Sequence, residues 1–326
     1  MILVTGASGL LGRHLLRYLS KEGSPIRALY NHTIPRLLDG TVADRIHWVK
    51  VDLLDLASLE THFESIRQVY HCAGVVSYDA RHYQKMYAVN VTGTQYIVDL
   101  CLQYQVQRLV HVSSIAALGN VPNQKGLIDE NSAYDEDYTT SYYGKTKKEA
   151  EMEVQRGIAE GLNAVIVNPS IILGEGDWQR SSTNLFKIVY DEFPFYTTGA
   201  TGWVMAEDVA RAMILLMNHK EIQPKRFIIS AENLSYQEVF TQMANMMHKK
   251  PPYIAAPKWM SGLVWRWHYI RSLLTGKQVT ITKETARAAY EVKKYDNQQL
   301  RTVLMGEFEF SNFKESIQRC TALMLK

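Results

Sequence analysis

The chain opens with an apolar run at residues 2–4, then a glycine at every third position from Gly6 to Gly12, then a helical pattern at residues 13–19. The leucines of the helical pattern fall on one face. This order predicts a buried strand, a tight turn and a helix that begins at the turn. Such a helix start presents free N–H groups and a positive dipole end, both of which suit a phosphate group.

The alternation of apolar strands and amphipathic helices continues through the first two-thirds of the chain. Further strands are predicted at residues 25–30, 46–51, 69–73, 108–112 and 164–167, and helices at 59–66, 84–104 and 142–161. Repeated β-α-β units build a parallel sheet with helices on both faces. We therefore expect an α/β protein with a doubly wound parallel sheet.

The last third changes character. A helix is predicted at 207–217, a strand at 226–230, and a second helix after the capping box of Ser235 and Glu238. We expect residues 1–170 to form the core, with 204–230 returning to it. Residues 171–203 and 231–326 would form a smaller, mixed and mostly helical substrate-binding cap.

Composition narrows the functional class. The 326 residues are 46% hydrophobic and 21% charged, with a net charge of +3 that is too small and dispersed for a nucleic-acid partner. No apolar run reaches the roughly 18–20 residues of a membrane span, and a strand at residue 2 leaves no room for a signal peptide. Cys72, Cys101 and Cys320 lie far apart, which disfavours disulfides and a metal site. A cytoplasmic enzyme is expected.

The glycine turn has a specific and a general interpretation. Gly6 would permit the tight turn, Gly9 would let a pyrophosphate approach, and Gly12 would let the helix pack on the strand. The spacing is G-x-x-G-x-x-G rather than the usual G-x-G-x-x-G, so a plain turn is the alternative. In parallel sheets ligands lie at the carboxyl ends of the strands, where this chain places Ser113 and Ser114.

Tyr143 and Lys147 are the candidate catalytic pair. They are four residues apart and therefore share one face of the predicted helix. A phenol has a pKa of about 10, which a nearby ammonium lowers, so that the tyrosine can exchange a proton with a carbonyl or alcohol oxygen. Tyr142 competes for the role, but the residue four positions on is Thr146, which is not a cation. The alternative is an ordinary surface pair.

Together these motifs resemble the extended branch of the short-chain dehydrogenase/reductase superfamily over essentially the whole chain. The resemblance implies a Rossmann fold and a nicotinamide cofactor. The matching segments are Thr5–Gly12, His71–Gly74, Asn90–Gly93, Val112–Ser114, Tyr143–Lys147, Asn168–Gly174, Trp203–Ala210 and Tyr295–Leu300.

The resemblance also assigns roles. Tyr143 would be the general acid/base, Lys147 would hold the nicotinamide ribose and depress the tyrosine pKa, and Ser114 would hydrogen-bond the substrate oxygen. The cofactor-binding positions would be Gly6, Ser8, Gly9, Leu10, Leu11, Gly12, Tyr30, Asn31, Arg36, Asp52, Leu53, Cys72, Ala73, Gly74, Asn90, Ser113, Tyr143, Lys147, Pro169, Ser170, Ile171 and Ile172.

The end of the second strand decides between NADP and NAD. An NAD site usually has an acid there for the ribose 2′-hydroxyl, whereas this chain has Tyr30 and Asn31. Arg36 or Arg13 could meet a 2′-phosphate instead. We therefore expect NADP in preference to NAD, with Asp52 and Leu53 at the adenine.

The expected reaction is reduction of a ketone or aldehyde, or its reverse, and the chain looks nearest to dihydroflavonol 4-reductases and 3β-hydroxysteroid dehydrogenases. Related dehydratases have Thr-Asp-Glu where this chain has residues 114–116, Ser-Ile-Ala. Residues 178–203 are aromatic, with Arg180 and Lys187 as cations, which favours an apolar substrate over a nucleotide sugar. The alternatives are a nucleotide-sugar epimerase and a non-catalytic dinucleotide-binding protein.

The sequence indicates two further surfaces that could contact a partner. Residues 258–274 combine tryptophans with Arg and Lys, a pattern that indicates either a helix on a membrane surface or, as we favour, packing over the cleft or a neighbouring subunit. A homodimer would form through the helices that hold Asn90 and Tyr143.

Overall fold

A computed structural model describes residues 1–135, 141–178, 181–219, 222, 226–275 and 282–324, with the side chains of 181, 264 and 268–275 left out. Its centre is a parallel sheet in the order β10-β6-β5-β4-β1-β2-β3. The strands are β1 (Ile2–Thr5), β2 (Ile26–Tyr30), β3 (Ile46–Lys50), β4 (Gln68–His71), β5 (Arg108–Val112), β6 (Ala164–Pro169) and β10 (Arg226–Ile229).

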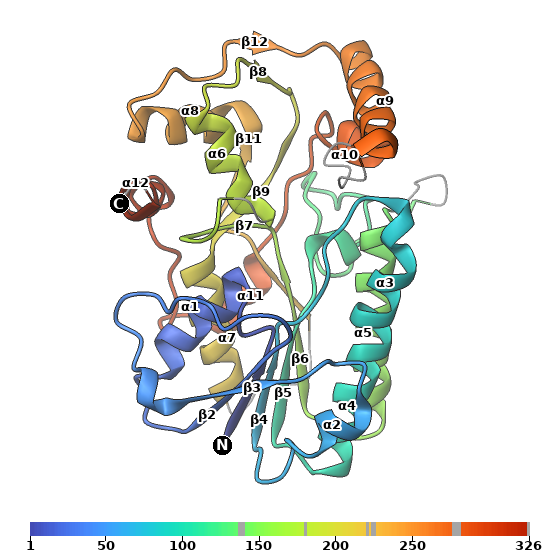
Figure 1. The fold of residues 1–326 in the computed structure, drawn as a ribbon, viewed down its shortest axis with the longest axis vertical. Coiled ribbons are helices and arrows are strands. Elements are labelled where there is room, and N and C mark those ends of the chain that lie inside the picture. The colour runs from blue at the N-terminus through green and yellow to red at the C-terminus, as the bar shows by residue number, and fades with distance from the viewer. Residues whose placement is uncertain (136–140, 179–180, 220–221, 223–225, 276–281, 325–326) are drawn as a thin grey trace.

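Helices cover both faces of this sheet (Figure 1). On one face lie α1 (Leu10–Leu19), α7 (Ala206–Asn218) and α11 (Gln298–Val303), and on the other α2 (Leu56–Glu60), α3 (Tyr83–Tyr87), α4 (Gly93–Gln103) and α5 (Tyr142–Ala159). The alternation within β1 explains the two layers, since Ile2 and Val4 join the core beside α1 and α7, whereas Leu3 joins the core beside α4 and α5. The expected doubly wound α/β fold is confirmed.

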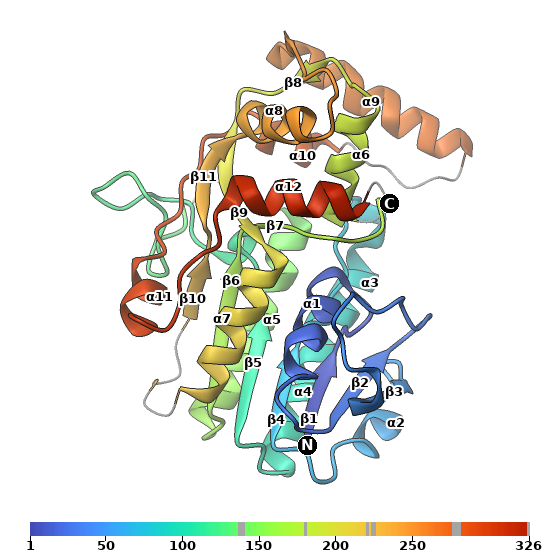
Figure 2. The ribbon, with the colours of Figure 1, turned by 90° about the vertical axis from the view of Figure 1, so that its left-hand side faces the viewer.

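A second group of elements stands beyond the carboxyl ends of the strands (Figures 1 and 2). It contains β7 (Ile171–Leu173), β8 (Phe195–Tyr196), β9 (Ala200–Met205), β11 (Glu232–Ser235), β12 (Ile254–Ala255), α6 (Asn184–Tyr190), α8 (Tyr236–Met246), α9 (Lys258–Thr275), α10 (Lys283–Ala288) and α12 (Phe313–Met324). The strands form two small sheets, β11-β9-β7 and β12-β8.

Two predicted helices differ from the structure. The helix expected at 59–66 begins at Leu56, where the Asp55 side chain accepts from the Ser58 N–H (3.1 Å), and ends at Glu60, ahead of Ser65 with a φ of 64°. The helix expected at 84–104 contains a π-helical turn at Ala88–Thr92. Such turns occur frequently at functional sites, and this one carries Asn90.

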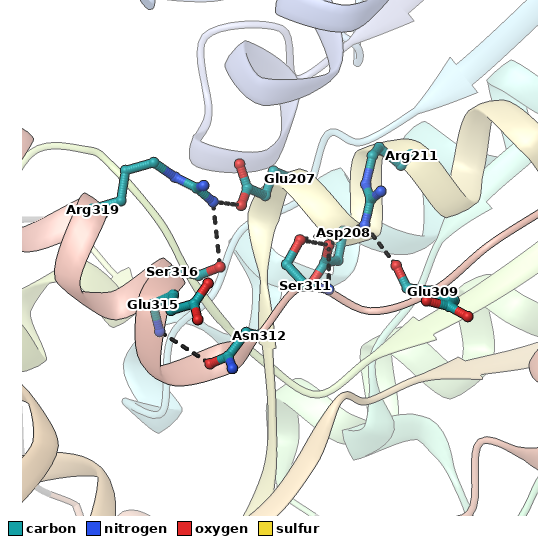
Figure 3. A network of polar contacts seen from close by, with 9 residues as sticks. All are labelled: Glu207, Asp208, Arg211, Glu309, Ser311, Asn312, Glu315, Ser316 and Arg319. Atoms are coloured by element: carbon teal, nitrogen blue, oxygen red, sulfur yellow. Dashed lines mark hydrogen bonds and ion pairs between the residues drawn. The ribbon is translucent and has the colours of Figure 1, made fainter.

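A network of polar contacts joins α7 to the C-terminal segment (Figure 3). Asp208 is fully buried, and its carboxylate accepts from the Ser311 Oγ (2.7 Å) and from the Arg211 guanidinium (2.6 Å). Arg319 of α12 pairs with Glu207 in the same cluster. This network therefore holds α12 to α7, which belongs to the helix layer of the central sheet. In Figure 2, α12 lies between α8 and α7.

Candidate active site

The glycine turn after β1 has room for no side chain at two positions. Gly6 has a φ of 63°, and a Cβ there would lie 2.6 Å from the backbone nitrogen of Ala73. A Cβ on Gly12 would lie 2.3 Å from the carbonyl oxygen of Gly6. Gly9 is exposed at the N-cap of α1 and offers no side-chain cap. The first N–H groups of α1 are therefore suited to an anionic ligand.

The residues between the three glycines are less exposed than Gly9. Leu11 is buried, and Ser8 and Leu10 are half-buried. The turn stands between β2 and β4, next to the point where the strand order reverses. Ligands of doubly wound sheets bind at that reversal.

Asn90 links the loop after β4 to α5. Its Oδ1 accepts from the Val75 N–H (2.7 Å), and its Nδ2 donates to the Val75 carbonyl (3.0 Å) and to the Thr146 Oγ1 (3.0 Å). A Cβ on Gly74 would lie 3.4 Å from Asn90 Oδ1 and 3.8 Å from the Lys147 Nζ. The buried Asn90 thus holds the end of β4 close to the lysine.

Ser114, Tyr143 and Lys147 come together at the carboxyl end of β5. The Lys147 Nζ donates to the carbonyl oxygen of Val112 (2.7 Å), two residues before Ser114. The Ser114 side chain lies near enough to the Tyr143 hydroxyl to act on its pKa, and the Ser114 Oγ accepts from the Ala116 N–H (3.1 Å). Tyr143 contacts the Tyr78 ring edge-on with 6.0 Å between centroids. Tyr142 instead packs against Tyr83 and is exposed. Of the two tyrosines, Tyr143 is therefore the one at the serine.

The pKa values of the pair differ from the sequence-based expectation. Burial raises the pKa of Tyr143 above its usual value, the charge of Tyr78 acts in the same direction, and only the nearby Ser114 side chain opposes them. The predicted lowering of the Tyr143 pKa by Lys147 is wrong for this structure: burial is the largest cause of the shift, and Lys147 is not among its causes. Burial also lowers the pKa of Lys147 to about 8, against the opposing charge of Glu151. Tyr143 is therefore a protonated phenol at neutral pH.

A buried polar network beneath Ser114 was not predicted. Asn168 donates to the Ser114 carbonyl (2.9 Å) and to Glu151 (2.6 Å), and Glu151 pairs with Arg226 (3.0 Å). The only indication of this network in the sequence is that Glu151 lies one helical turn after Lys147. The network ties β6, β10 and α5 to the backbone of the candidate catalytic serine.

The residues expected near the adenine and its ribose differ in how far they are exposed. Tyr30 packs edge-on against Trp48, Asn31 and Arg36 are exposed, and Leu53 is buried. The Asp52 carboxylate accepts from the Leu54 N–H (3.0 Å). The Arg13 guanidinium donates to the carbonyl oxygen of Glu175 (3.3 Å).

The remaining expected cofactor positions follow β4 and β6. Cys72 and Ala73 are half-buried, and Ala73 donates to the Thr5 Oγ1 (3.2 Å). Pro169 belongs to β6, and the Ser170 N–H donates to the Ile229 carbonyl (3.1 Å). That N–H is therefore engaged within the sheet. Ile171 and Ile172 pair with β9 as part of β7 and are half-buried.

Two of the aromatic residues of the 178–203 region are part of the protein interior. Phe186 and Trp203 are fully buried, and the Trp203 indole donates to the Leu234 carbonyl (3.0 Å). Lys187 pairs with Asp191 (2.5 Å). Arg180 lies outside the described residues.

The site fits a dinucleotide. The glycine turn is a cradle that a Cβ would fill, and the buried Ser113 Oγ at the end of β5 has no hydrogen-bond partner among the described residues. Both features lie at the carboxyl edge of the sheet. In the described part of the chain, no group of three His, Cys, Asp or Glu side chains could hold a metal ion.

Comparisons with known proteins identify related sequences and a shared fold. The chain is 29% identical over 265 residues to sterol demethylase protein B of Methylococcus capsulatus, covering 80% of this chain and 79% of that protein. It is 27% identical over 263 residues to a Synechocystis protein described as a putative dihydroflavonol 4-reductase, covering 79% and 75%. The UDP-glucose 4-epimerase of Thermotoga maritima superposes with a TM-score of 0.79 at 15% identity, covering 99% and 98%, and so shares the fold.

A family model matches residues 2–230, which contain the glycine turn, both serines and the Tyr143–Lys147 pair. The chain therefore belongs to the NAD dependent epimerase/dehydratase family.

Proposed function

We propose that the protein reduces a ketone or aldehyde to an alcohol, or catalyses the reverse reaction, with a nicotinamide cofactor. The observation that carries this proposal is the contact of Ser114 with a protonated Tyr143, one helical turn before the buried Lys147. A reduced nicotinamide, when bound, would supply the hydride.

The side chains of this chain would handle the proton and the oxygen. A substrate carbonyl between Ser114 and Tyr143 would accept hydrogen bonds from both hydroxyl groups. Because its pKa is raised, Tyr143 holds its proton at neutral pH and would donate it to the developing alkoxide. Lys147, fixed to the Val112 carbonyl, would stabilise the phenolate that remains. Asn90 would keep the loop after β4 at the same edge.

An apolar carbonyl compound is the substrate class we favour. Lys187, one of the two cations of the 178–203 region, is already paired with Asp191. The names of two relatives, a sterol demethylase protein and a putative dihydroflavonol 4-reductase, point to ring-containing apolar molecules. Residues 171–203 and 231–326 would form the substrate-binding part.

NADP is the cofactor we favour within an NAD-dependent family. No acid follows β2, where Asn31 is exposed, and the exposed Arg36 lies five residues on. An acid there would repel a 2′-phosphate. We also infer a homodimer through the α3–α5 face, which exposes Met152 (58%) and Tyr87 (39%).

A nucleotide-sugar epimerase is the second candidate. The family name includes epimerases, and the Thermotoga structure contains UDP-glucose. A tyrosine that exchanges a proton with an alcohol oxygen suits either reaction, so the substrate decides between the two candidates.

The test is a substrate screen with purified protein. Apolar ketones and aldehydes are offered with NADH and NADPH in parallel, and UDP-, GDP- and dTDP-sugars with NAD. Turnover of a carbonyl compound, faster with NADPH, supports the proposal. Turnover of sugar nucleotides alone supports the epimerase, and cofactor binding without any turnover supports a non-catalytic protein.

A further inference from the structure

Helix α9 carries an exposed apolar stripe. Trp259, Leu263 and Trp267 recur at every fourth position and are 69%, 60% and 58% exposed. Residues four apart lie on the same side of a helix. Within a single chain, therefore, this side of α9 is not packed over the cleft, which was one of the two arrangements that the sequence favoured; the other was packing on a neighbouring subunit.

The apolar surface continues onto the two-stranded sheet that precedes α9. Tyr253 and Ile254 are 71% and 37% exposed, and Phe193, just before β8, is 51% exposed. β8, β12 and α9 lie at the end of the molecule opposite the N-terminus (Figure 1). We call these six residues, Phe193, Tyr253, Ile254, Trp259, Leu263 and Trp267, the cap face.

Around the cap face the sequence has a single sign of charge. Between Glu238 and Glu284 it contains seven Lys or Arg residues and no Asp or Glu. Lys250, Lys258 and Arg266 are exposed in the structure.

Acidic residues near this segment come from other elements and already have cationic or backbone partners. Asp191 pairs with Lys187, and Glu192 accepts from the backbone N–H of Lys250 (3.3 Å). Glu291, which lines a pocket together with Lys258, pairs with Arg287 and Lys293. The cap face therefore combines large apolar side chains with a segment whose own charges are all basic.

We propose that the cap face docks on the surface of an anionic lipid bilayer. Helices that lie in a bilayer interface combine Trp and Leu on one side with Lys and Arg beside them. Anionic headgroups attract the cations, while the aromatic and leucine side chains enter the headgroup–acyl boundary. No helix in the described part of the chain is long and apolar enough to cross a membrane, so the contact is peripheral.

A second copy of the chain fits this surface less well. A twofold interface brings a patch against itself. Here it would place two basic segments, neither of which contains a carboxylate, across from each other. An anionic lipid surface supplies the opposite charge that a second copy lacks.

The experiment is sedimentation with sucrose-loaded vesicles of phosphatidylcholine, with and without phosphatidylglycerol. Wild-type protein should bind the vesicles that contain phosphatidylglycerol and be released by high salt. The double variant Trp259→Ser, Leu263→Ser should lower the partition coefficient at least about tenfold. Lys258→Gln with Arg266→Gln should lower binding to the anionic vesicles by about tenfold.

A matched control removes exposed apolar side chains elsewhere. Met305 and Val42 are 82% and 40% exposed, and Met305→Ser with Val42→Ser should bind vesicles like wild type. Circular dichroism and cofactor affinity verify that each variant is folded.

Three results would overturn the proposal. Wild-type protein could stay in the supernatant with anionic vesicles. The Trp259→Ser, Leu263→Ser variant could bind as wild type does. Sedimentation velocity could reveal a dimer that only this variant dissociates, in which case the cap face is a subunit interface.

Discussion

The Lys147 ammonium donates a hydrogen bond of 2.7 Å to the carbonyl oxygen of Val112, and so joins α5 to the carboxyl end of β5. Ser113 and Ser114 follow Val112 directly. The bond therefore fixes the two serines against the helix that carries Tyr143. Burial lowers the pKa of Lys147 to about 8, so folding disfavours its charge. A charge kept in such a place is typical of a functional residue.

Replacing Lys147 should lower turnover without lowering the free energy of unfolding. Its pKa falls from 10.5 to about 8 on folding, so at pH 7 the buried charge costs stability that Lys147→Met removes. The free energy of unfolding should stay the same or rise, by up to about 3 kcal/mol, while turnover falls about a hundredfold. Urea denaturation and steady-state rates measure both, with the exposed Lys145→Met as control. A large loss of stability would instead make Lys147 a structural support.

The raised pKa of Tyr143 predicts different pH profiles for the two reaction directions. Carbonyl reduction needs the phenol, which persists through neutral pH because burial raises its pKa. Alcohol oxidation needs the phenolate, so its rate should rise with pH. Loss of the Lys147 charge near pH 8 affects both directions alike. Between about pH 6 and 7.5, below the pKa of Lys147, reduction kcat/KM should therefore stay level while oxidation kcat/KM rises with pH. A reduction kcat/KM that already falls with pH across this range would mean that a group other than Tyr143 donates the proton, because the phenol keeps its proton there.

Three buried histidines should make the fold sensitive to acid. Burial lowers the pKa of His71 to about 3 and that of His14 to about 4, from 6.5, and it also lowers the pKa of His111 well below 6.5. Between these values and 6.5 the unfolded chain binds protons that the folded chain does not. Stability is therefore complete above pH 6.5 and falls as the pH drops, by up to about 1.4 kcal/mol per pH unit for each histidine.

Urea denaturation at several pH values measures this loss. His14→Leu should reduce the slope by the share of one histidine, whereas the exposed His47→Gln should leave the slope unchanged. An unaltered slope in His14→Leu would mean that His14 is protonated in the folded protein.

Gly12 of the glycine turn should tolerate a side chain less well than Gly93 at the start of α4. A Cβ on Gly12 would lie 2.3 Å from the backbone oxygen of Gly6, so Gly12→Ala must displace the main chain. It should lower the free energy of unfolding by at least about 2 kcal/mol and weaken cofactor binding. In Gly93→Ala the new Cβ would lie 3.5 Å from the Leu53 side chain, an ordinary contact within a helix. That control should stay within about 1 kcal/mol of wild type. Equal stability of the two variants would show that the turn can relax.

Local patterns were enough to predict the central sheet. The apolar runs at β1, β2, β3 and β5 match their predicted strands within a residue. β1 and β5 are buried along their whole length, as central strands of a parallel sheet are. The turn at Gly6–Gly12 and the helix after it follow from residues that are neighbours in the chain. The capping box of Ser235 and Glu238 formed as expected for the same reason.

Features that depend on distant segments could not be predicted. The three short strands of the β11-β9-β7 sheet are defined by pairing, such as Ile171 with Trp203, rather than by apolar periodicity. The hydrogen bonds of Asn168 to Ser114 and Glu151 require β6 and α5 to be already packed. The direction of the Tyr143 pKa shift depends on burial, which the spacing to Lys147 does not reveal.

The central claim, that Tyr143 is the proton donor in carbonyl reduction, is tested most directly by comparing Tyr143→Phe with Tyr142→Phe. Both variants remove one hydroxyl from adjacent residues, but Tyr143 lies at Ser114, whereas Tyr142 is exposed against Tyr83. On a substrate found in the screen, Tyr143→Phe should lose about 10²- to 10⁴-fold in kcat with unchanged cofactor affinity, and Tyr142→Phe should keep wild-type turnover. Wild-type turnover by Tyr143→Phe would contradict the account.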